Sequence, residues 1–266
     1  MTSALVGHTG FVGSNFALQH DFDATYNTSN IADIAGKRYD LVVSAANRAD
    51  SHRINHGAGQ EDRAEIQDYV DLLSRAEIGK LVLVSTVSLY PPLTSPDEDT
   101  PVTEEGLLPY GANRAYQEHV LASRFDTLIL RLPQLYGANL KKGIVYDLLN
   151  DYRVEHIRPR LAFQHYDLSR VWADTRIALE HGLGSLNVAP PPIESGTVAQ
   201  QVFGRDIWGQ HADVEETPES LGYTRDMRTK HGALFAPAGR AAPDGYLMTE
   251  EQELEAIAAF VARQRR

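Results

Sequence analysis

The sequence predicts a doubly wound parallel α/β fold, and three observations carry this prediction. Short apolar runs alternate with helix-like stretches over the first 135 residues. The apolar runs are continuous rather than alternating, which is typical of strands covered on both faces. A glycine-rich turn at residues 7–13 joins the first apolar run to the first helical stretch. Together these features indicate a parallel sheet between two layers of helices.

The elements of this sheet follow one another at regular spacing. We expect strands over residues 3–6, 24–27, 40–45, 80–84 and 127–132, and helices over 11–19, 61–76 and 114–123. Ile66, Tyr69, Val70 and Leu73 recur at the spacing of one helix face. Only 12 residues separate positions 27 and 40, too few for a complete helix–strand–helix insertion. We therefore expect a shortened sheet edge on that side.

The alternation of apolar runs and helix-like stretches becomes irregular after residue 136 and is clear again near the C-terminal end. Residues 168–181 read as a helix and 185–189 as a strand, and three prolines at 190–192 then break the chain. Residues 191–247 are rich in proline, glycine and charge. A helix is expected over 249–266, with Thr249 and Gln252 in the two positions of a capping box.

The amino-acid composition excludes several classes of function. The 266 residues include no cysteine, which excludes a disulfide scaffold, a thiol nucleophile and a cysteine-ligated metal. With 25 basic and 36 acidic residues the net charge is −11, which argues against non-specific binding to nucleic acid or membrane surfaces. No apolar run approaches the roughly 20 residues of a membrane helix. The N-terminus lacks a basic region before its apolar stretch, so we expect no signal peptide and a soluble, cytoplasmic protein.

The glycine turn has the spacing GxxGxxG between a strand and a helix, the context in which such a motif binds a dinucleotide. One glycine permits the tight turn, one lets the backbone approach a pyrophosphate, and one allows close helix–strand packing. The helix that follows offers free N–H groups to the phosphates. The predicted dinucleotide contacts in this loop are Gly7, Thr9, Gly10, Phe11, Val12 and Gly13.

The end of the second strand predicts how the adenosine ribose is held. An acidic residue about 20 positions after the loop would bind the ribose of NAD. Here the segment carries Asn27, Ser29 and Asn30, with neither an acid nor an arginine. These neutral groups accept either a hydroxyl or a 2′-phosphate. We expect NAD(P), with NADP favoured by a small margin because nothing in this segment repels a phosphate.

A hydroxyl and a tyrosine form the candidate catalytic pair. Thr86 stands two residues after the strand expected over 80–84, and Tyr110 follows Thr86 by 24 residues. A tyrosine with an ordinary pKa near 10 is a poor base at neutral pH unless a nearby cation stabilises the phenolate. Arg114 stands four residues after Tyr110, on the same face of a helix. The hydroxyl of Thr86 would orient a substrate oxygen.

These residues resemble the extended short-chain dehydrogenase/reductase family, and within it the NAD-dependent epimerase/dehydratase branch acting on nucleotide sugars. Four matches carry the resemblance, namely the glycine loop, Ala45-Ala46-Asn47 after a strand, the hydroxyl followed by Tyr-x-x-x-basic, and RLPQLYG at 131–137. The resemblance implies a Rossmann-type fold with Tyr110 as acid/base and Thr86 as its hydroxyl partner. Further implied cofactor contacts are Ala45, Ala46, Asn47, Ser85, Tyr110, Arg114 and Pro133, and Ser88 and Gln134 would face the substrate.

Arg114 departs from the family, which has lysine at this position. Arginine keeps the positive charge and can bond ribose hydroxyls, but it is bulkier, planar and does not deprotonate. Electrostatic support of Tyr110 survives, whereas a proton relay through this residue becomes doubtful. An active site using arginine, a slow or altered enzyme, and a protein that binds dinucleotide without turnover all remain open.

Basic residues outside the first 135 positions suit an anionic substrate. Lys141 and Lys142 lie in a loop beyond a strand end and suit a diphosphate, although a solvated charge pair would look the same. Arg225 and Arg228 lie in a basic stretch of the C-terminal segment, where this family tends to close over its substrate. His52 and His56 stand four apart beside a glycine, and we expect no metal there.

The sequence thus predicts an NAD(P)-dependent oxidoreductase acting on a nucleotide sugar, either an epimerase or a 4-keto reductase. Val87 and Ser88 stand where a dehydratase has an acidic pair, which weakens dehydration. The competing hypothesis is a dinucleotide-binding sensor of the same fold. We expect a dinucleotide domain over 1–135 and 166–190, a substrate subdomain over 136–165 and 191–247, and a terminal helix over 248–266. A homodimer through the helices 61–76 and 114–123 is expected from the family.

Overall fold

The structure, a computed structural model, describes residues 1–211, 224–236 and 244–265 and divides into two compact units. The first unit comprises Met1–Pro91, Thr100–Arg131 and Val171–Leu186. The second comprises Pro92–Asp99, Leu132–Arg170 and Asn187–Arg266. No helix among the described residues is both long and apolar enough to cross a bilayer.

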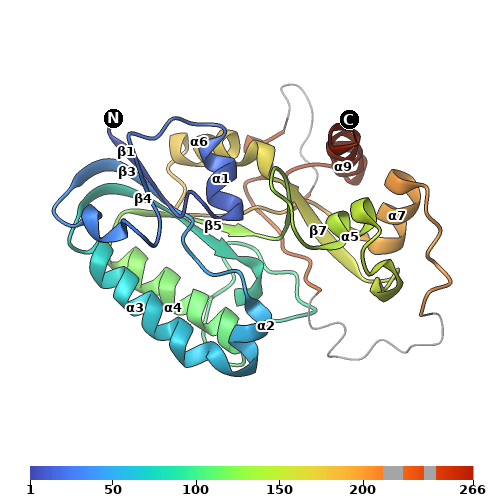
Figure 1. Cartoon of the computed structure of the whole chain (residues 1–266), viewed down its shortest axis with the longest axis horizontal. Helices are drawn as coiled ribbons and strands as arrows, with labels where there is room; N and C mark the ends of the chain where they lie inside the picture. Colours follow the sequence, from blue (N-terminus) through green and yellow to red (C-terminus); the bar gives the residue numbers. More distant parts are fainter. Residues whose placement is uncertain (212–223, 237–243, 266) are drawn as a thin grey trace. The chain divides into compact units, whose positions relative to one another are not determined.

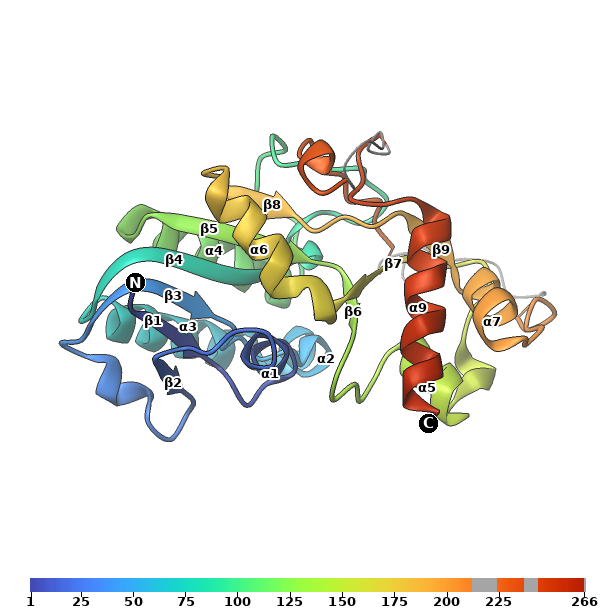
Figure 2. The ribbon, with the colours of Figure 1, turned by 90° about the horizontal axis from the view of Figure 1, so that it is seen from above.

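The first unit is built on a six-stranded parallel sheet of order β2-β1-β3-β4-β5-β8 (Figure 2). Its strands are β1 (Ser3–Val6), β2 (Ala24–Tyr26), β3 (Arg38–Ser44), β4 (Glu77–Thr86), β5 (Thr127–Leu132) and β8 (Ser185–Asn187). All four residues of β1 and all six of β5 are buried. This explains why the sequence shows continuous apolar runs there rather than alternation.

Helices cover both faces of this sheet (Figure 1). One layer holds α3 (Gly59–Leu73) and α4 (Pro109–Arg124), and the other holds α1 (Phe11–Ala17) and α6 (Val171–Glu180). A short helix, α2 (Ser51–Arg53), precedes α3. The predicted fold class is confirmed, because the sheet is parallel, lies between helices and is of the Rossmann type.

The sheet edge formed by β2 is short, as the sequence predicts. Between β2 and β3 there is only one helical turn, Ile31–Ile34. Ile34 is fully buried in the core, and the hydroxyls of Tyr26 and Tyr39 share a hydrogen bond of 2.6 Å. A single buried side chain and one pair of tyrosines therefore close the edge where a further strand and helix do not fit.

The second unit has a three-stranded sheet of order β6-β7-β9, with β6 and β7 parallel and β7 and β9 antiparallel. Its elements are β6 (Gln134–Tyr136), α5 (Ile144–Asn150), β7 (Ala162–Asp167), β9 (Pro192–Glu194), α7 (Ser195–Phe203) and α9 (Glu250–Gln264). The predicted capping box is present at the start of α9, where Thr249 accepts from the backbone of Gln252 and Gln252 accepts in return.

The helix that carries Tyr110 begins earlier than its apolar pattern indicates. We expected it over 114–123, whereas α4 starts at Pro109. Proline suits the first helical position because it has no N–H to satisfy. The N–H of Tyr110 donates to the side chain of Asn55 at 2.9 Å, so a residue from another segment caps this helix end. Tyr110 consequently lies in the first turn of α4.

Candidate active site

The glycine loop is packed so closely that two of its glycines are required by space. Gly7 has a φ of +87°, and a Cβ there would lie 2.4 Å from the carbonyl oxygen of Ala45. A Cβ on Gly13 would lie 2.0 Å from the carbonyl oxygen of Gly7. The first glycine therefore permits the turn, and the third lets α1 pack on the loop, as a dinucleotide-binding turn requires.

Gly13→Ala is expected to destabilise the fold by about 2 kcal/mol or more, because the methyl group would overlap backbone that cannot move aside. Urea unfolding followed by circular dichroism measures the loss. Gly184→Ala is the matched control, since Gly184 has open space around it and an ordinary φ. Equal stability of the two variants would show that Gly13 is not a packing glycine.

The middle glycine faces outward. Gly10 is exposed, and a Cβ there would have the carbonyl oxygens of Gly7 at 3.3 Å and Ala45 at 3.9 Å as its nearest neighbours. It precedes α1, whose start has no side-chain cap. Thr9 is also exposed, while Phe11 and Val12 form the first turn. The space over Gly10 is the cradle that the pyrophosphate of a dinucleotide would fill.

The predicted ribose segment forms a tight local turn. The side-chain oxygen of Asn27 accepts from the backbone N–H of Ser29 at 2.9 Å and from its hydroxyl at 2.6 Å. Asn30 accepts from the N–H of Asn27 at 2.8 Å and donates to the carbonyl of Thr25 at 3.1 Å. Both asparagines are therefore used to shape the turn directly after β2.

Residues 45–47 lie beside the glycine loop. The N–H of Ala45 donates to the carbonyl of Val6 at 2.9 Å. The side chain of Asn47 donates to the carbonyl of Val84 at 3.0 Å, which ties this loop to the end of β4. Because β1 pairs with β3 and β3 with β4, the three loops meet at one edge of the sheet. Ligands of open α/β sheets bind at such an edge.

Two hydroxyls follow at the end of β4. The hydroxyl of Thr86 accepts from the N–H of Ser88 at 3.2 Å and keeps its own proton for donation. Ser85 is buried, and its hydroxyl has no hydrogen-bond partner among the described residues. A buried hydroxyl without a partner is costly unless a ligand or solvent completes it. Ser85 therefore fits the predicted cofactor contact.

Gly111 packs the first turn of α4 against the segment after β4. A Cβ on Gly111 would lie 2.4 Å from the carbonyl oxygen of Ser88, so the first turn of α4 packs directly on the segment after β4. Tyr110 itself is partly exposed. The predicted pair Thr86 and Tyr110 thus stands on two backbone segments in van der Waals contact. The close contact of Gly111 with the Ser88 carbonyl oxygen explains why a glycine follows Tyr110.

Arg114 is held by a buried carboxylate. Its side chain is 1% exposed, and it donates to Asp62 at 2.9 and 3.2 Å and to the carbonyl of Arg48 at 3.0 Å. The guanidinium carbon lies 4.8 Å from the centre of the Tyr110 ring. Removing one partner of such a buried pair costs about 3–5 kcal/mol. The Nε–H of Arg114 has no acceptor in the described part of the chain, which fits a ribose hydroxyl.

The remaining predicted site residues belong to the second unit. Pro133 precedes β6 and Gln134 begins it, while Lys141 and Lys142 are exposed in the turn before α5. Arg225 is partly buried, and this burial lowers the pKa of its guanidinium. Arg228 forms an ion pair with Asp226 at 2.6 Å and lies over the ring of Tyr246. Arg228 is thus held by contacts within the second unit.

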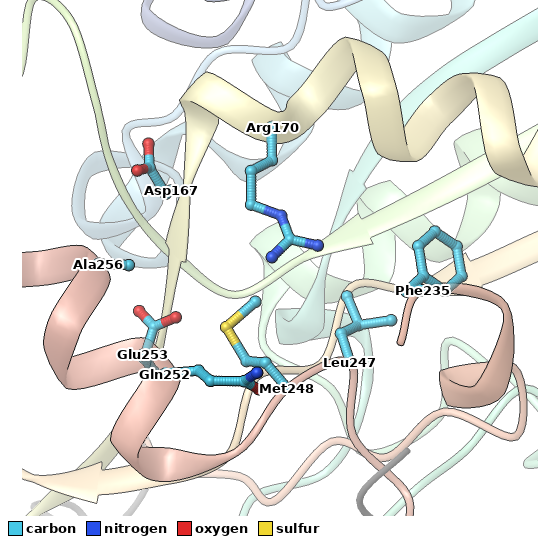
Figure 3. A pocket seen from close by; sticks show the side chains of 8 residues that line it. All are labelled: Asp167, Arg170, Phe235, Leu247, Met248, Gln252, Glu253 and Ala256. Atoms are coloured by element: carbon cyan, nitrogen blue, oxygen red, sulfur yellow. The ribbon is translucent and has the colours of Figure 1, made fainter. Parts of the chain in front are cut away.

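A cavity of about 220 Å³ lies in the second unit beside the start of α9 (Figure 3). Its lining residues are Asp167, Arg170, Phe235, Leu247, Met248, Gln252, Glu253 and Ala256. None of the residues that the sequence predicts for the site lines it. Glu253 is fully buried, and burial together with the charge of Asp167 raises the pKa of Glu253 to about 8.

Sequence reasoning missed three residues of the site: Asn55, Asp62 and Asn113. Asn55 caps α4, and Asn113 donates to Asp62 and to the carbonyl of Gly59, each at 2.8 Å. The signal that could have found Asp62 is the arginine itself, because a buried arginine needs a carboxylate. The sequence alone does not say which of the 36 acidic residues supplies it.

The two histidines singled out in the sequence lie against each other. The ring centres of His52 and His56 are 4.3 Å apart, and Nδ1 of His56 is 2.7 Å from the carbonyl oxygen of His52. Among the described residues, no group of three or more histidines and carboxylates is placed to hold a metal ion. His165 and Tyr166 are both buried in β7.

Comparison with known structures reveals the same fold in nucleotide-sugar enzymes. MoeE5 in complex with UDP-glucose and NAD has a TM-score of 0.68 at 13% identity, with 100% of each chain covered. The dTDP-glucose 4,6-dehydratase DesIV from Streptomyces venezuelae, with NAD and TYD bound, gives 0.67 at 16% identity, covering 100% of this chain and 97% of that chain. Human epimerase family protein SDR39U1 with NADPH gives 0.61 at 20%, covering 77% and 81%.

Comparison of the sequence with family models identifies the family of this chain. No curated protein sequence gives a significant match. The model of the NAD dependent epimerase/dehydratase family matches residues 18–161, more than half of the chain. That range includes the ends of β3 and β4 and the whole of α4, where Thr86, Tyr110 and Arg114 lie. The chain therefore belongs to the NAD-dependent epimerase/dehydratase family.

Proposed function

We propose that the protein is an NAD(P)-dependent enzyme that epimerises a nucleotide sugar by hydride transfer, with Tyr110 as acid and base. The observation that supports the proposal is the close packing of α4 on the segment after β4, at Gly111 and Ser88, because Tyr110 and Thr86 belong to these two neighbouring backbone segments. Arg114 supplies the cation next to the ring of Tyr110. A dinucleotide sensor would need neither a tyrosine nor a hydroxyl in this arrangement.

The chain's own residues account for proton movement and orientation. When bound, the nicotinamide accepts and returns a hydride. The hydroxyl of Thr86, fixed by the N–H of Ser88, donates to the substrate oxygen and orients it. Tyr110 Oη takes the proton of the substrate hydroxyl and later gives it back. The positive charge of Arg114 favours the phenolate during this exchange.

The buried state of Arg114 favours epimerisation over net reduction. A reductase consumes one proton in each turnover, whereas an epimerase returns the proton that it removed. Arg114 does not deprotonate and is closed off by Asp62, so it supplies no route for protons from solvent. A self-contained exchange between Tyr110 and substrate needs no such route. The 4-keto reductase is the second candidate within the same chemistry.

A nucleotide sugar is the substrate class that the relatives support. MoeE5 is seen with UDP-glucose, and DesIV is a dTDP-glucose dehydratase. In this chain Lys141 and Lys142 are exposed and suit a diphosphate. NADP remains favoured over NAD by a small margin, since the turn at 27–30 presents neutral groups. Among the relatives, MoeE5 is seen with NAD and SDR39U1 with NADPH.

The test begins with the dinucleotide. We would identify any nucleotide that co-purifies with the protein and titrate it with NADH and NADPH, following nicotinamide fluorescence. Turnover is then measured with UDP-glucose and dTDP-glucose. Tightly retained NAD⁺ with interconversion of a sugar epimer supports the proposal, and exchangeable NADP⁺ that is reduced stoichiometrically as the sugar hydroxyl is oxidised, the reverse of keto reduction, favours the reductase. Binding without any turnover would make the protein a sensor, and the absence of binding would end the enzyme assignment.

Gly10→Ala is expected to weaken dinucleotide binding at least tenfold while changing stability by less than about 1 kcal/mol. The added methyl group would occupy the cradle rather than the fold, because only the carbonyl of Gly7 lies within 3.4 Å of it. Fluorescence titration and urea unfolding of the same preparation separate the two effects. Unchanged dinucleotide affinity would place the pyrophosphate elsewhere.

A further inference from the structure

One carboxylate fixes the orientation of the Arg114 guanidinium. Asp62, in the first turn of α3, accepts from Nη1 at 3.2 Å and from Nη2 at 2.9 Å. Nη2 also donates to the carbonyl of Arg48, one residue after the loop over 45–47. Both side chains are almost fully buried, at 1% and 5% exposure. Arg114 therefore links α4 both to Asp62 and to the loop predicted to contact the cofactor.

The same carboxylate braces the first turn of α4 at a second point. Asp62 accepts from the side chain of Asn113, which also donates to the carbonyl of Gly59. Asn55, seven residues before Asp62, accepts the N–H of Tyr110. A Cβ on Gly59 would lie 2.8 Å from the side chain of Pro109, so α3 and α4 touch at their starts. The position of Tyr110 thus depends on the segment that carries Asp62.

Asp62 also balances the charge beside Tyr110. A lone cation at the distance of Arg114 would favour the phenolate. The carboxylate of Asp62 opposes that effect. Other charged groups of these segments have partners of their own, because Arg48 binds Glu65 at 2.7 Å and Glu118 binds Arg131 at 2.8 Å. The charge beside the Tyr110 ring is therefore that of Arg114 paired with Asp62.

We infer that Asp62 is a positioning residue of this site, which holds Arg114 against Tyr110 and the 45–47 loop and sets how far the cation favours the phenolate. The Arg114–Asp62 pair takes the place of the single lysine expected from the family pattern. The inference rests on the proposed function, since it concerns the reactivity of Tyr110. A merely structural ion pair would stabilise the fold without affecting the protonation of the tyrosine.

The test is the pH profile of kcat/KM, measured with UDP-glucose or dTDP-glucose, whichever is turned over faster. Asp62→Asn keeps the shape of the side chain and removes its charge, so the limb due to Tyr110 should move down by about one pH unit. The double variant Asp62→Asn/Arg114→Gln removes both charges, including that of the guanidinium 4.8 Å from the ring centre, and should move the limb up. This double variant buries no unpaired charge and serves if the single variant does not fold.

Glu118→Gln is the matched control. It removes the charge of a second buried carboxylate, Glu118. This residue lies on α4, two turns beyond Tyr110, and its partner is Arg131. We expect the Tyr110 limb of the pH profile to move in this variant by less than a third of the shift caused by Asp62→Asn. An unmoved limb in both Asp62 variants, with turnover intact in the wild type, overturns the inference and leaves the proposed function standing. A wild type that binds NADH or NADPH but turns over neither sugar, or binds neither nucleotide, defeats the proposed function and the inference with it.

Discussion

Replacing Tyr110 with phenylalanine is expected to lower turnover about a thousandfold while the affinity for NADH and NADPH stays within threefold. The loss is that of a general acid and base, which contributes roughly 10²–10⁴ to the rate. Dinucleotide affinity is preserved because the glycine loop, residues 45–47 and Ser85 are untouched. The ring still packs beside Arg114, so the fold should keep its stability within about 1 kcal/mol.

Tyr116→Phe provides the control for this change. Tyr116 is on the same helix, and its hydroxyl donates to Gln67 rather than facing Thr86. Its ring also lies under a guanidinium, that of Arg63. We expect this variant to turn over at the wild-type rate. If Tyr110→Phe retains more than a tenth of the wild-type rate, Tyr110 is not the acid and base, and the proposed mechanism is wrong.

Glu253→Gln is expected to stabilise the protein at pH 8 by roughly 3 kcal/mol and to change little at pH 5. The carboxyl is fully buried, neither of its oxygens has a hydrogen-bond partner among the described residues, and its pKa is raised to about 8 from 4.5. Between these values the folded protein holds a proton that the unfolded chain has released. Stability therefore falls as the pH rises from about 4.5 to about 8, and it levels off above.

Urea unfolding at intervals from pH 5 to 9 measures this dependence. Glu255→Gln is the control, because Glu255 is exposed on the same helix. The wild type and the Glu255 variant should lose stability together over this range, and the Glu253 variant should lose less. Asp167 lines the same cavity, and its charge contributes to the raised pKa of Glu253. Parallel curves for all three proteins would show that Glu253 is not buried with a raised pKa.

The sheet and the glycine loop could be predicted because local sequence determines them. The strands β1 and β5 have the residues that were expected, and the spacing between β2 and β3 revealed the short edge. Gly7 and Gly13 indicate the turn, since only glycine satisfies its spatial demands at these two positions. Thr86, Tyr110 and Arg114 could be proposed because their spacing is that of the family.

The parts of the structure that could not be predicted depend on contacts between residues that are far apart in the sequence. β7 lies in the stretch where the apolar pattern becomes irregular, and tertiary packing rather than periodicity supports it. Tyr136, Ile193 and Val198 are buried in one core with Ile257 of α9, about 60 to 120 residues away in the chain. Asp62 is similar, because its role depends on the packing of α3 against α4 and on an arginine 52 positions later.

The position of β8 has a consequence for the way the chain folds during synthesis. β8 is the last strand of the six-stranded sheet and pairs with β5, although more than 50 residues separate the two strands and most of that insertion belongs to the second unit. A growing chain therefore cannot complete the sheet until residue 187 has left the ribosome. Until then the edge of β5 is unpaired, and such contacts between distant segments form slowly. Occupancy of that edge by a chaperone would protect the nascent protein from strand-to-strand aggregation.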